Sequence, residues 1–154
     1  MNTSETIPVE GVLAYRVRRR GVVVEDVCEQ NLVMNLPRNY LKQLLAGEQA
    51  VWPAGWAVSH IAFDAVADAP DGTEAAADLV EPFTKAVGGH IYPDGTVGEV
   101  RFLWTLTNAE ANGSTIRRFA LLLADGSLFS LKSRAGAIEK DEDVDLEGSW
   151  TLKF

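Results

Sequence analysis

Three acidic residues near the end of the chain have the spacing of a calcium-binding loop. Asp141, Asp143 and Asp145 alternate as the first ligands of an EF-hand loop do. That loop also requires glycine at its sixth position and a bidentate glutamate at its twelfth, where this chain has Leu146 and Leu152. Because the pattern fails twice, we expect a solvated acidic loop here.

The other residue types that bind metals are sparse. His60 and His90 are far apart in the sequence, and neither has a second histidine, a cysteine or a carboxylate at ligand spacing, so a zinc site is not predicted. Asp64, Asp68 and Asp71 could form a calcium site of another kind, although a solvated loop is the simpler interpretation. The sequence therefore predicts no metal site.

Nucleophilic and phosphate chemistry have no sequence signature either. Cys28 lacks the flanking residues of a catalytic cysteine, and a free cysteine in a strand usually behaves as a small core residue. There is no Gly-x-Ser-x-Gly motif, and Gly88-Gly89 is an isolated pair outside any glycine-rich phosphate loop. We predict a non-enzymatic protein with no cofactor, and an enzyme stays open only as a third option.

Two groups of residues are candidates for partner contact instead. Strand alternation would place Arg16, Arg18 and Arg20 on one face as a basic stripe, which is either a solvated sheet face or a contact for an acidic partner. Trp52 and Trp56 lie on one loop, where the two rings either cap a seam between helix and sheet or anchor an interface.

Opposite charges are segregated along the chain. Six of the 22 acidic residues lie in Glu139–Glu147, and four of the 14 basic residues lie in Arg16–Arg20. Such patches on two copies of one chain could meet across a subunit interface. The net charge of −8 disfavours nucleic-acid binding.

A hairpin over Ile116–Lys132 is the predicted centre of the fold. Asp125-Gly126 favours a tight two-residue turn. The arm before it, Phe119–Leu123, is continuously apolar, which is typical of a strand buried on both faces. In the arm after it, alternation predicts one face with Leu128, Ser130 and Lys132 and another with Ser127, Phe129 and Leu131.

The remaining elements must cover this hairpin. Strands are expected at 12–20 and 22–28 around Gly21, at 57–64, at 84–91 and 96–107 around the hairpin turn Pro93-Asp94-Gly95, and at 149–154. Alternation predicts that the strand at 96–107 is half-buried, with Val100, Phe102, Trp104 and Leu106 on one face, and that Trp150, Leu152 and Phe154 share one face of the last strand. Leu79–Phe83 is predicted to be an edge strand or a linker, and Arg134–Glu147 is predicted to be a loop. Leucines at helical spacing, with Pro37 at the start and Gly47 past the end, predict one short helix at about 37–46.

These elements favour a mainly β fold, an antiparallel β-sandwich or flattened barrel with one short helix. We expect a polar N-terminal arm at 1–10 and a single domain at 11–154. No apolar run approaches the ~20 residues that cross a bilayer, and the N-terminus lacks a signal-peptide pattern, so no membrane insertion is expected.

Several phrases together resemble small tail-associated structural proteins of tailed bacteriophages, including N-terminal parts of some tail-fibre proteins. The phrases are Asn31–Val33 leading into Arg38–Gly47, Ser59–Phe63, Ala69–Glu74, Glu81–Phe83, Ile116–Leu122 and Gly148–Phe154. Such proteins often carry Gly-x-Gly after the Ile-Ala strand, where this chain has Asp64-Ala65-Val66.

The resemblance implies a β-rich, non-enzymatic virion component of the baseplate or tail-fibre attachment. It would assemble in symmetric copies, as a ring or trimer, and dock on other virion tail proteins. Two alternatives stay open at this point. One is a capsid decoration or cement protein, and the other is a carbohydrate- or receptor-binding module that uses Trp52 and Trp56.

Overall fold

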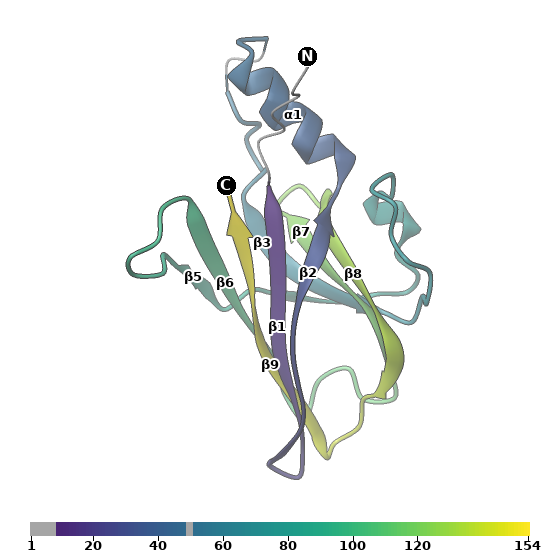
Figure 1. Ribbon diagram of the computed structural model, residues 1–154. Helices are drawn as coiled ribbons and strands as arrows, with labels where there is room; N and C mark the ends of the chain where they lie inside the picture. Colours follow the sequence, from purple (N-terminus) through teal and green to yellow (C-terminus); the bar gives the residue numbers. More distant parts are fainter. Residues whose placement is uncertain (1–8, 49–50) are drawn as a thin grey trace.

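The computed structural model describes residues 9–48 and 51–154 and shows one antiparallel sheet that curls into half a barrel (Figure 1). The prediction of a mainly antiparallel β fold with one short α-helix is confirmed for the described residues. The order of the strands across the sheet is β4-β3-β7-β8-β2-β1-β9-β6-β5. The elements are β1 (Glu10–Arg19), β2 (Val22–Val33), α1 (Asn35–Leu45), β3 (Val58–Asp64), a 3-10 turn (Ala76–Asp78), β4 (Phe83–Ala86), β5 (Gly89–Ile91), β6 (Glu99–Leu106), β7 (Thr115–Leu123), β8 (Leu128–Glu139) and β9 (Val144–Lys153).

The first strand begins two residues earlier than the sequence predicts. Residues 1–8 of the expected arm lie outside the described residues. Val9 already packs against the core, and Glu10 opens β1. The two strands predicted around Gly21 are present and form a hairpin, because Arg19 pairs with Val22 across a two-residue turn in which Arg20 and Gly21 both have positive φ.

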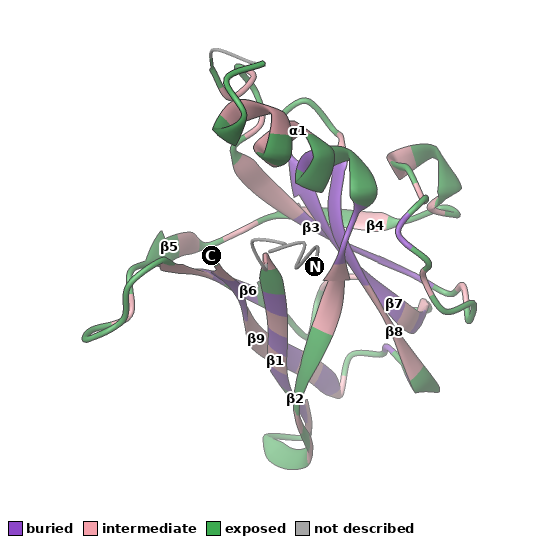
Figure 2. Ribbon diagram, turned by 45° about the horizontal axis from the view of Figure 1, so that its top comes forward, coloured by how far each residue is buried: buried purple, intermediate pink, exposed green. Residues whose placement is uncertain are grey.

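The β7–β8 hairpin lies near the middle of one half of the sheet, and the prediction for β7 holds. Every residue from Arg118 to Leu123 is buried, so the strand is covered on both faces (Figure 2). The predicted two-residue turn is wrong. The Gly126 N–H donates to the Leu123 carbonyl and Gly126 has a positive φ, which makes a three-residue loop of the type that ends in a glycine bulge.

The predicted alternation of β8 is also wrong. Leu122 pairs with Leu128 while Leu121 pairs with Ser130, so Phe129 is an extra residue in the ladder. This bulge turns Phe129 into the main core and leaves Leu131 in a second cluster on the outer face. A bulge of this kind depends on the partner strand, so alternation within β8 alone does not reveal it.

The loop predicted at Arg134–Glu147 is wrong as well. β8 continues to Glu139, β9 already begins at Val144, and only residues 140–143 connect them. Within the acidic run, Val144 and Leu146 are buried while Asp145 and Glu147 point outward. The acidic run therefore includes the first part of an amphipathic strand. Its many acidic residues obscure the alternation of apolar and charged residues in the sequence.

The predicted arm at 84–91 is divided between the two edges of the sheet. β4 pairs with β3, whereas β5 pairs with β6. Between them, the Val87 N–H donates to the Ser59 carbonyl of β3, and the Gly88 N–H donates to the Leu103 carbonyl of β6. Val87 and Gly88 thus connect β4 and β5, the strands at the two edges, and this short connection requires the sheet to curl. Leu79–Val80 lies in a linker, and β4 starts at Phe83.

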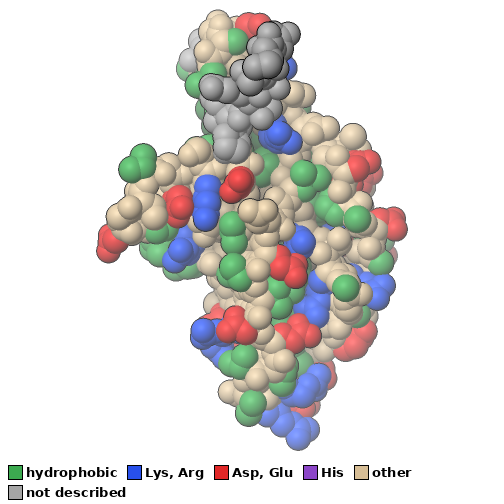
Figure 3. Space-filling view, in the orientation of Figure 1, with side chains coloured by type: hydrophobic (Ala, Val, Ile, Leu, Met, Phe, Trp, Pro, Cys, Tyr) green, Lys and Arg blue, Asp and Glu red, His purple; other side chains and the backbone are tan. Residues whose placement is uncertain are grey.

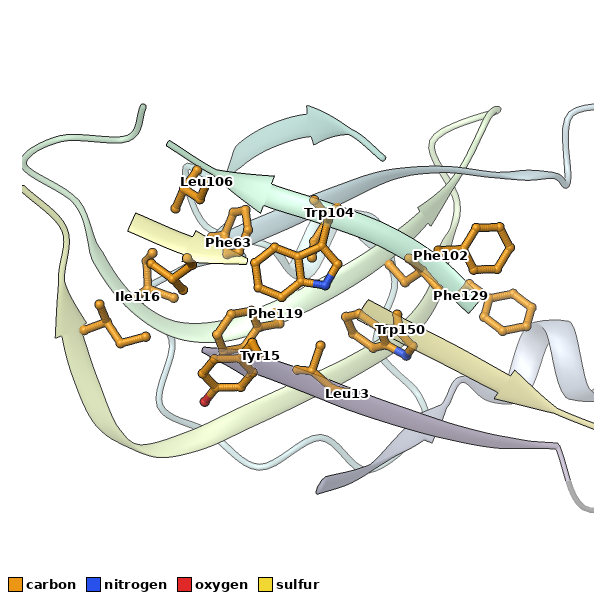
Figure 4. Close-up of a cluster of buried hydrophobic side chains, with 14 of the residues drawn as sticks. Leu13, Tyr15, Phe63, Phe102, Trp104, Leu106, Ile116, Phe119, Phe129 and Trp150 are labelled. Carbon is orange, nitrogen blue, oxygen red and sulfur yellow. The ribbon is translucent and has the colours of Figure 1, made fainter. Parts of the chain in front are cut away.

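The core fills the inside of the curl with side chains from both halves of the sheet (Figure 4). The alternation predicted for β6 is confirmed, because Phe102, Trp104 and Leu106 are buried in it. The Trp104 ring lies over Gly148 of β9, where a Cβ would come 2.4 Å from Cζ2 of that ring. Trp150 and Leu152 are core residues as expected, whereas Phe154 lies beyond β9 and is exposed.

Helix α1 crosses the upper end of the curl and is only partly covered (Figures 1 and 2). Tyr40, Leu41 and Leu44 are half-buried, but Leu36 and Leu45 at the two flanks of the predicted leucine face are exposed. The helix begins two residues before the predicted start. Because Leu36 and Leu45 are exposed, α1 leaves apolar surface open to solvent.

Candidate functional site

The tryptophan loop packs against the chain's own helix. The rings of Trp52 and Trp56 meet edge to face at a centroid distance of 5.1 Å, and Tyr40 of α1 lies 5.7 Å from Trp52 and 5.0 Å from Trp56. Nε1 of Trp52 donates to the Trp56 carbonyl at 2.7 Å, and Nε1 of Trp56 donates to a carboxylate oxygen of Asp125 at 2.8 Å. Both indoles thus cap the seam between α1 and the sheet.

Asp125 connects this aromatic cluster to the β7–β8 hairpin. Its carboxylate accepts the Ser127 N–H at 2.9 Å, and this bond, with further support from Trp56, lowers the pKa of the Asp125 carboxyl. The Asp125 N–H in turn donates to the Gly55 carbonyl. Half-buried, hydrogen-bonded indoles make a poor stacking platform for a sugar, so the cluster supports α1 rather than presenting two open ring faces.

The basic stripe is paired within the chain. Arg18 lies 3.1 Å from Asp145 and also bonds to Glu147, and Arg20 lies 3.2 Å from Asp143. These pairs form because β1 and β9 are antiparallel neighbours that place Arg18 opposite Asp145. The basic and acidic segments thus already meet inside one molecule, as the mixed colours at the lower end of Figure 3 show, and a contact between copies through them stays a prediction.

The other two arginines of the basic segment are also paired. Arg16 pairs with Asp26 of β2 at 3.4 Å, and Arg19 pairs with Asp141 at 3.4 Å. The carboxylates that suggested a calcium loop are therefore arginine partners. Among the described residues, no three His, Cys, Asp or Glu side chains gather as metal ligands. Because every pair is at least partly open to solvent, each contributes little to stability. Partner contact through Arg16, Arg18 and Arg20 stays a prediction.

Sequence reasoning missed a buried ion pair. The Asp64 carboxylate accepts from Nε of Arg118 at 2.9 Å and from Nη2 at 2.6 Å, with both side chains almost fully buried. Asp64 also accepts the N–H groups of Val66 and Val80, and Arg118 donates to the Asp78 carbonyl at 3.1 Å. The pair fastens loop 65–82 over the outer face of β7. An arginine directly before the apolar run Phe119–Leu123 was the available signal, since a buried charge needs a partner.

Lys140 is a second buried charge that the sequence did not reveal. Its Nζ donates to Asn112 Oδ1 at 2.8 Å and to the Asp141 carbonyl at 2.9 Å. Burial lowers the pKa of this ammonium group. Gly113 and Ser114 make backbone bonds with Lys140, so the residue closes the loop between β6 and β7 and has a structural role.

The histidines and the cysteine do not form a site. His60 bonds to the adjacent Ser59 hydroxyl at 2.7 Å, and His90 lies on β5 against Tyr92 and Phe102. Cys28 is exposed on β2, so the expectation of a small core residue is wrong. That part of β2 is exposed because β8 pairs with β2 only at Leu32 and Val33.

Among the hollows on the surface of the described residues, two differ clearly in their lining. One of about 490 Å³ lies on the outer face of β1, β9 and β6, where Ala14 and Ser149 add little bulk. Its charged residues, Arg16, Asp26 and Glu147, belong to the ion pairs above. The other, about 50 Å³, lies between α1 and the end of the sheet. Its apolar lining consists of Val9, Val33, Leu41, Trp52, Phe129 and Phe154, and Arg38 stands at its edge.

No protein-family model, curated protein or solved structure matches this chain. Among the described residues, no helix is long and apolar enough to cross a membrane. The resemblance to phage tail proteins therefore rests on the sequence phrases alone.

Proposed function

We propose that this chain is a non-enzymatic structural subunit of a bacteriophage tail, at the baseplate or at the attachment of a tail fibre. In this role it resides in the virion and acts by assembling with copies of itself and with other tail proteins. The support comes from the sequence resemblance and from apolar residues exposed on two projecting elements. Trp52 and Trp56 enter the proposal as the support of one of these elements, α1.

Exposed apolar side chains on α1 and on the β5–β6 hairpin carry the proposal. Val97 is 97% exposed and Tyr92 is 73% exposed at the end of the hairpin, and Leu45 is 61% exposed on α1. Figure 1 shows both elements extending from the body of the sheet. Single exposed apolar residues are ordinary, but groups of them on projecting elements are typical of protein–protein contacts.

The charged side chains of the sheet favour the same role. Arg16, Arg18 and Arg20 already have partners within the chain, so a charged partner would have to replace existing ion pairs. Apolar contacts have no such competitor and contribute most of the affinity of typical interfaces. The proposal therefore assigns assembly mainly to the apolar projections, with charges acting at their margin.

Mass spectrometry of purified virions tests this role. Particles separated into tail and capsid fractions should contain the chain in the tail fraction, and deletion of its gene should leave particles with defective tails. Enrichment in the capsid fraction would favour the decoration-protein alternative. Absence of the chain from purified particles would overturn the proposal.

A further inference from the structure

We propose that two copies of this chain dock reciprocally, each placing the end of its β5–β6 hairpin in the apolar hollow beneath α1 of the other. This inference rests on the proposed assembly role and names the contact that would serve it. The occupant is a second copy of the chain.

The inserting element is the hairpin end, defined as Tyr92–Val97. It connects β5 to β6 and carries Tyr92 and Val97, the two most exposed large apolar side chains of the described residues. Asp94 lies at the turn and makes no ion pair within the described part of the chain. The hairpin end thus combines apolar side chains with one free negative charge.

The receiving element combines an apolar hollow with positive charge. The hollow of about 50 Å³ is lined by Leu41, Trp52 and Phe154 among others, and has room for one small branched aliphatic side chain. Arg38 stands at its edge, and Lys42 follows one turn later on the exposed side of α1. Neither cation has an ion-pair partner among residues 9–48 and 51–154. Glu48, the nearest acidic residue along the chain, lies past the end of the helix.

The two elements are complementary in both respects that matter for docking. Val97 matches the apolar hollow, and Asp94 matches Arg38 and Lys42 in charge. They also lie at the same end of the molecule, because Phe154, which lines the hollow, donates its N–H to the Gly98 carbonyl at the base of the hairpin. One surface that carries both halves of a contact is what a two-fold, isologous dimer requires.

Sedimentation velocity across a concentration series tests the contact. Val97→Asp should weaken self-association at least about tenfold, because the anchor of the contact is lost. Val22→Asp is the matched control: Val22 is also exposed, but it lies at the β1–β2 turn far from both elements, and its variant should associate like wild type. Circular dichroism of both variants should show unchanged folding.

Charge reversal tests the reciprocal pairing. Asp94→Lys should weaken association about fivefold, as should Arg38→Glu with Lys42→Glu, and the triple variant should recover most of the loss. Unchanged association in Val97→Asp, or no recovery in the triple variant, would overturn this contact. A wild-type chain that is monomeric at every concentration would also overturn it, while detection of the chain in virion tails would leave the proposed function standing.

Discussion

The two halves of the curled sheet differ in how their outer faces are protected. The outer face of β3, β7 and β8 is buried under loop 65–82, with Ala120 and Leu131 packed beneath it. The outer face of β1, β9 and β6 is open to solvent and carries Arg18, Asp145 and Glu147 in ion pairs that are only partly buried. A loop of the chain covers the first face, whereas charged side chains in contact with water cover the second.

The difference shows how burial changes the contribution of an ion pair to stability. On the covered face, the Asp64 carboxylate has arginine and two backbone N–H groups as donors, because a carboxylate buried without them would be strongly unfavourable. On the open face, water solvates the charges, and their pairing adds little stability. A single buried pair can therefore matter more than a whole group of pairs that water can reach. The variants Asp64→Ala and Arg18→Ala test this difference directly.

The largest effect is expected from breaking the buried pair. Asp64→Ala should reduce the free energy of unfolding by about 3–5 kcal/mol, because Arg118 would remain buried without a counter-ion. Urea denaturation measures this change. The double variant Asp64→Leu/Arg118→Met removes both charges and should recover most of the loss. If Asp64→Ala lowered the free energy of unfolding no more than Arg18→Ala does, the proposed difference between the two faces would be wrong.

The next effect concerns the inner side of the open half. Gly148→Ala should cost about 1–3 kcal/mol, because the new Cβ would meet the Trp104 ring at 2.4 Å and the Ala14 carbonyl at 2.6 Å. Gly136→Ala is the matched control, since nothing lies within 4 Å of a Cβ there, and its cost should stay within about 0.5 kcal/mol. Equal urea midpoints for the two variants would show that Trp104 does not need the space over Gly148.

The exposed pairs should give a smaller effect. Arg18→Ala removes the partner of Asp145 and Glu147, and it should lower stability measurably only at low ionic strength, because salt screens solvent-exposed charges. Thermal melts at low and high salt measure this dependence. A large loss that persists in high salt would mean that the open face relies on its ion pairs as the covered face does.

The smallest effect is expected where the two halves meet. Lys85 of β4 donates to Glu110 at 2.7 Å and to the Thr105 carbonyl of β6 at 2.9 Å. Burial alone would raise the pKa of Glu110, but hydrogen bonds from Lys85 and Thr107 outweigh it and lower the pKa below its ordinary 4.5. The stability contributed by this carboxylate is therefore complete above pH 4.5 and is lost as pH falls through its pKa in the folded protein.

Urea midpoints measured through this acidic range, for wild type and for Glu110→Gln, check the sign. The wild type should lose more stability on acidification than the variant, because glutamine does not titrate. Parallel curves for the two proteins would show that Glu110 does not contribute to the acid response.

Several features of this protein could be predicted from the sequence because they depend on neighbours along the chain. The apolar run Phe119–Leu123 predicted a strand buried on both faces, and the alternation in 99–106 predicted one buried on a single face. Gly21 marked the boundary between two strands, and it adopts the positive φ that the turn between them needs. Helical spacing placed α1 to within two residues. Each signal spans only a few residues.

The tertiary structure decided which residues meet across the sheet. Arg18 reaches Asp145 only because β1 and β9 are neighbours, and Asp64 reaches Arg118 only through the register of β3 with β7. The extra residue Phe129 in β8 likewise depends on its pairing with β7. Strand periodicity fixes the face on which a side chain lies, but not the strand that will lie beside it. The candidate contact surface, with the β5–β6 hairpin and the hollow under α1 at one end of the molecule, arises from that long-range pairing.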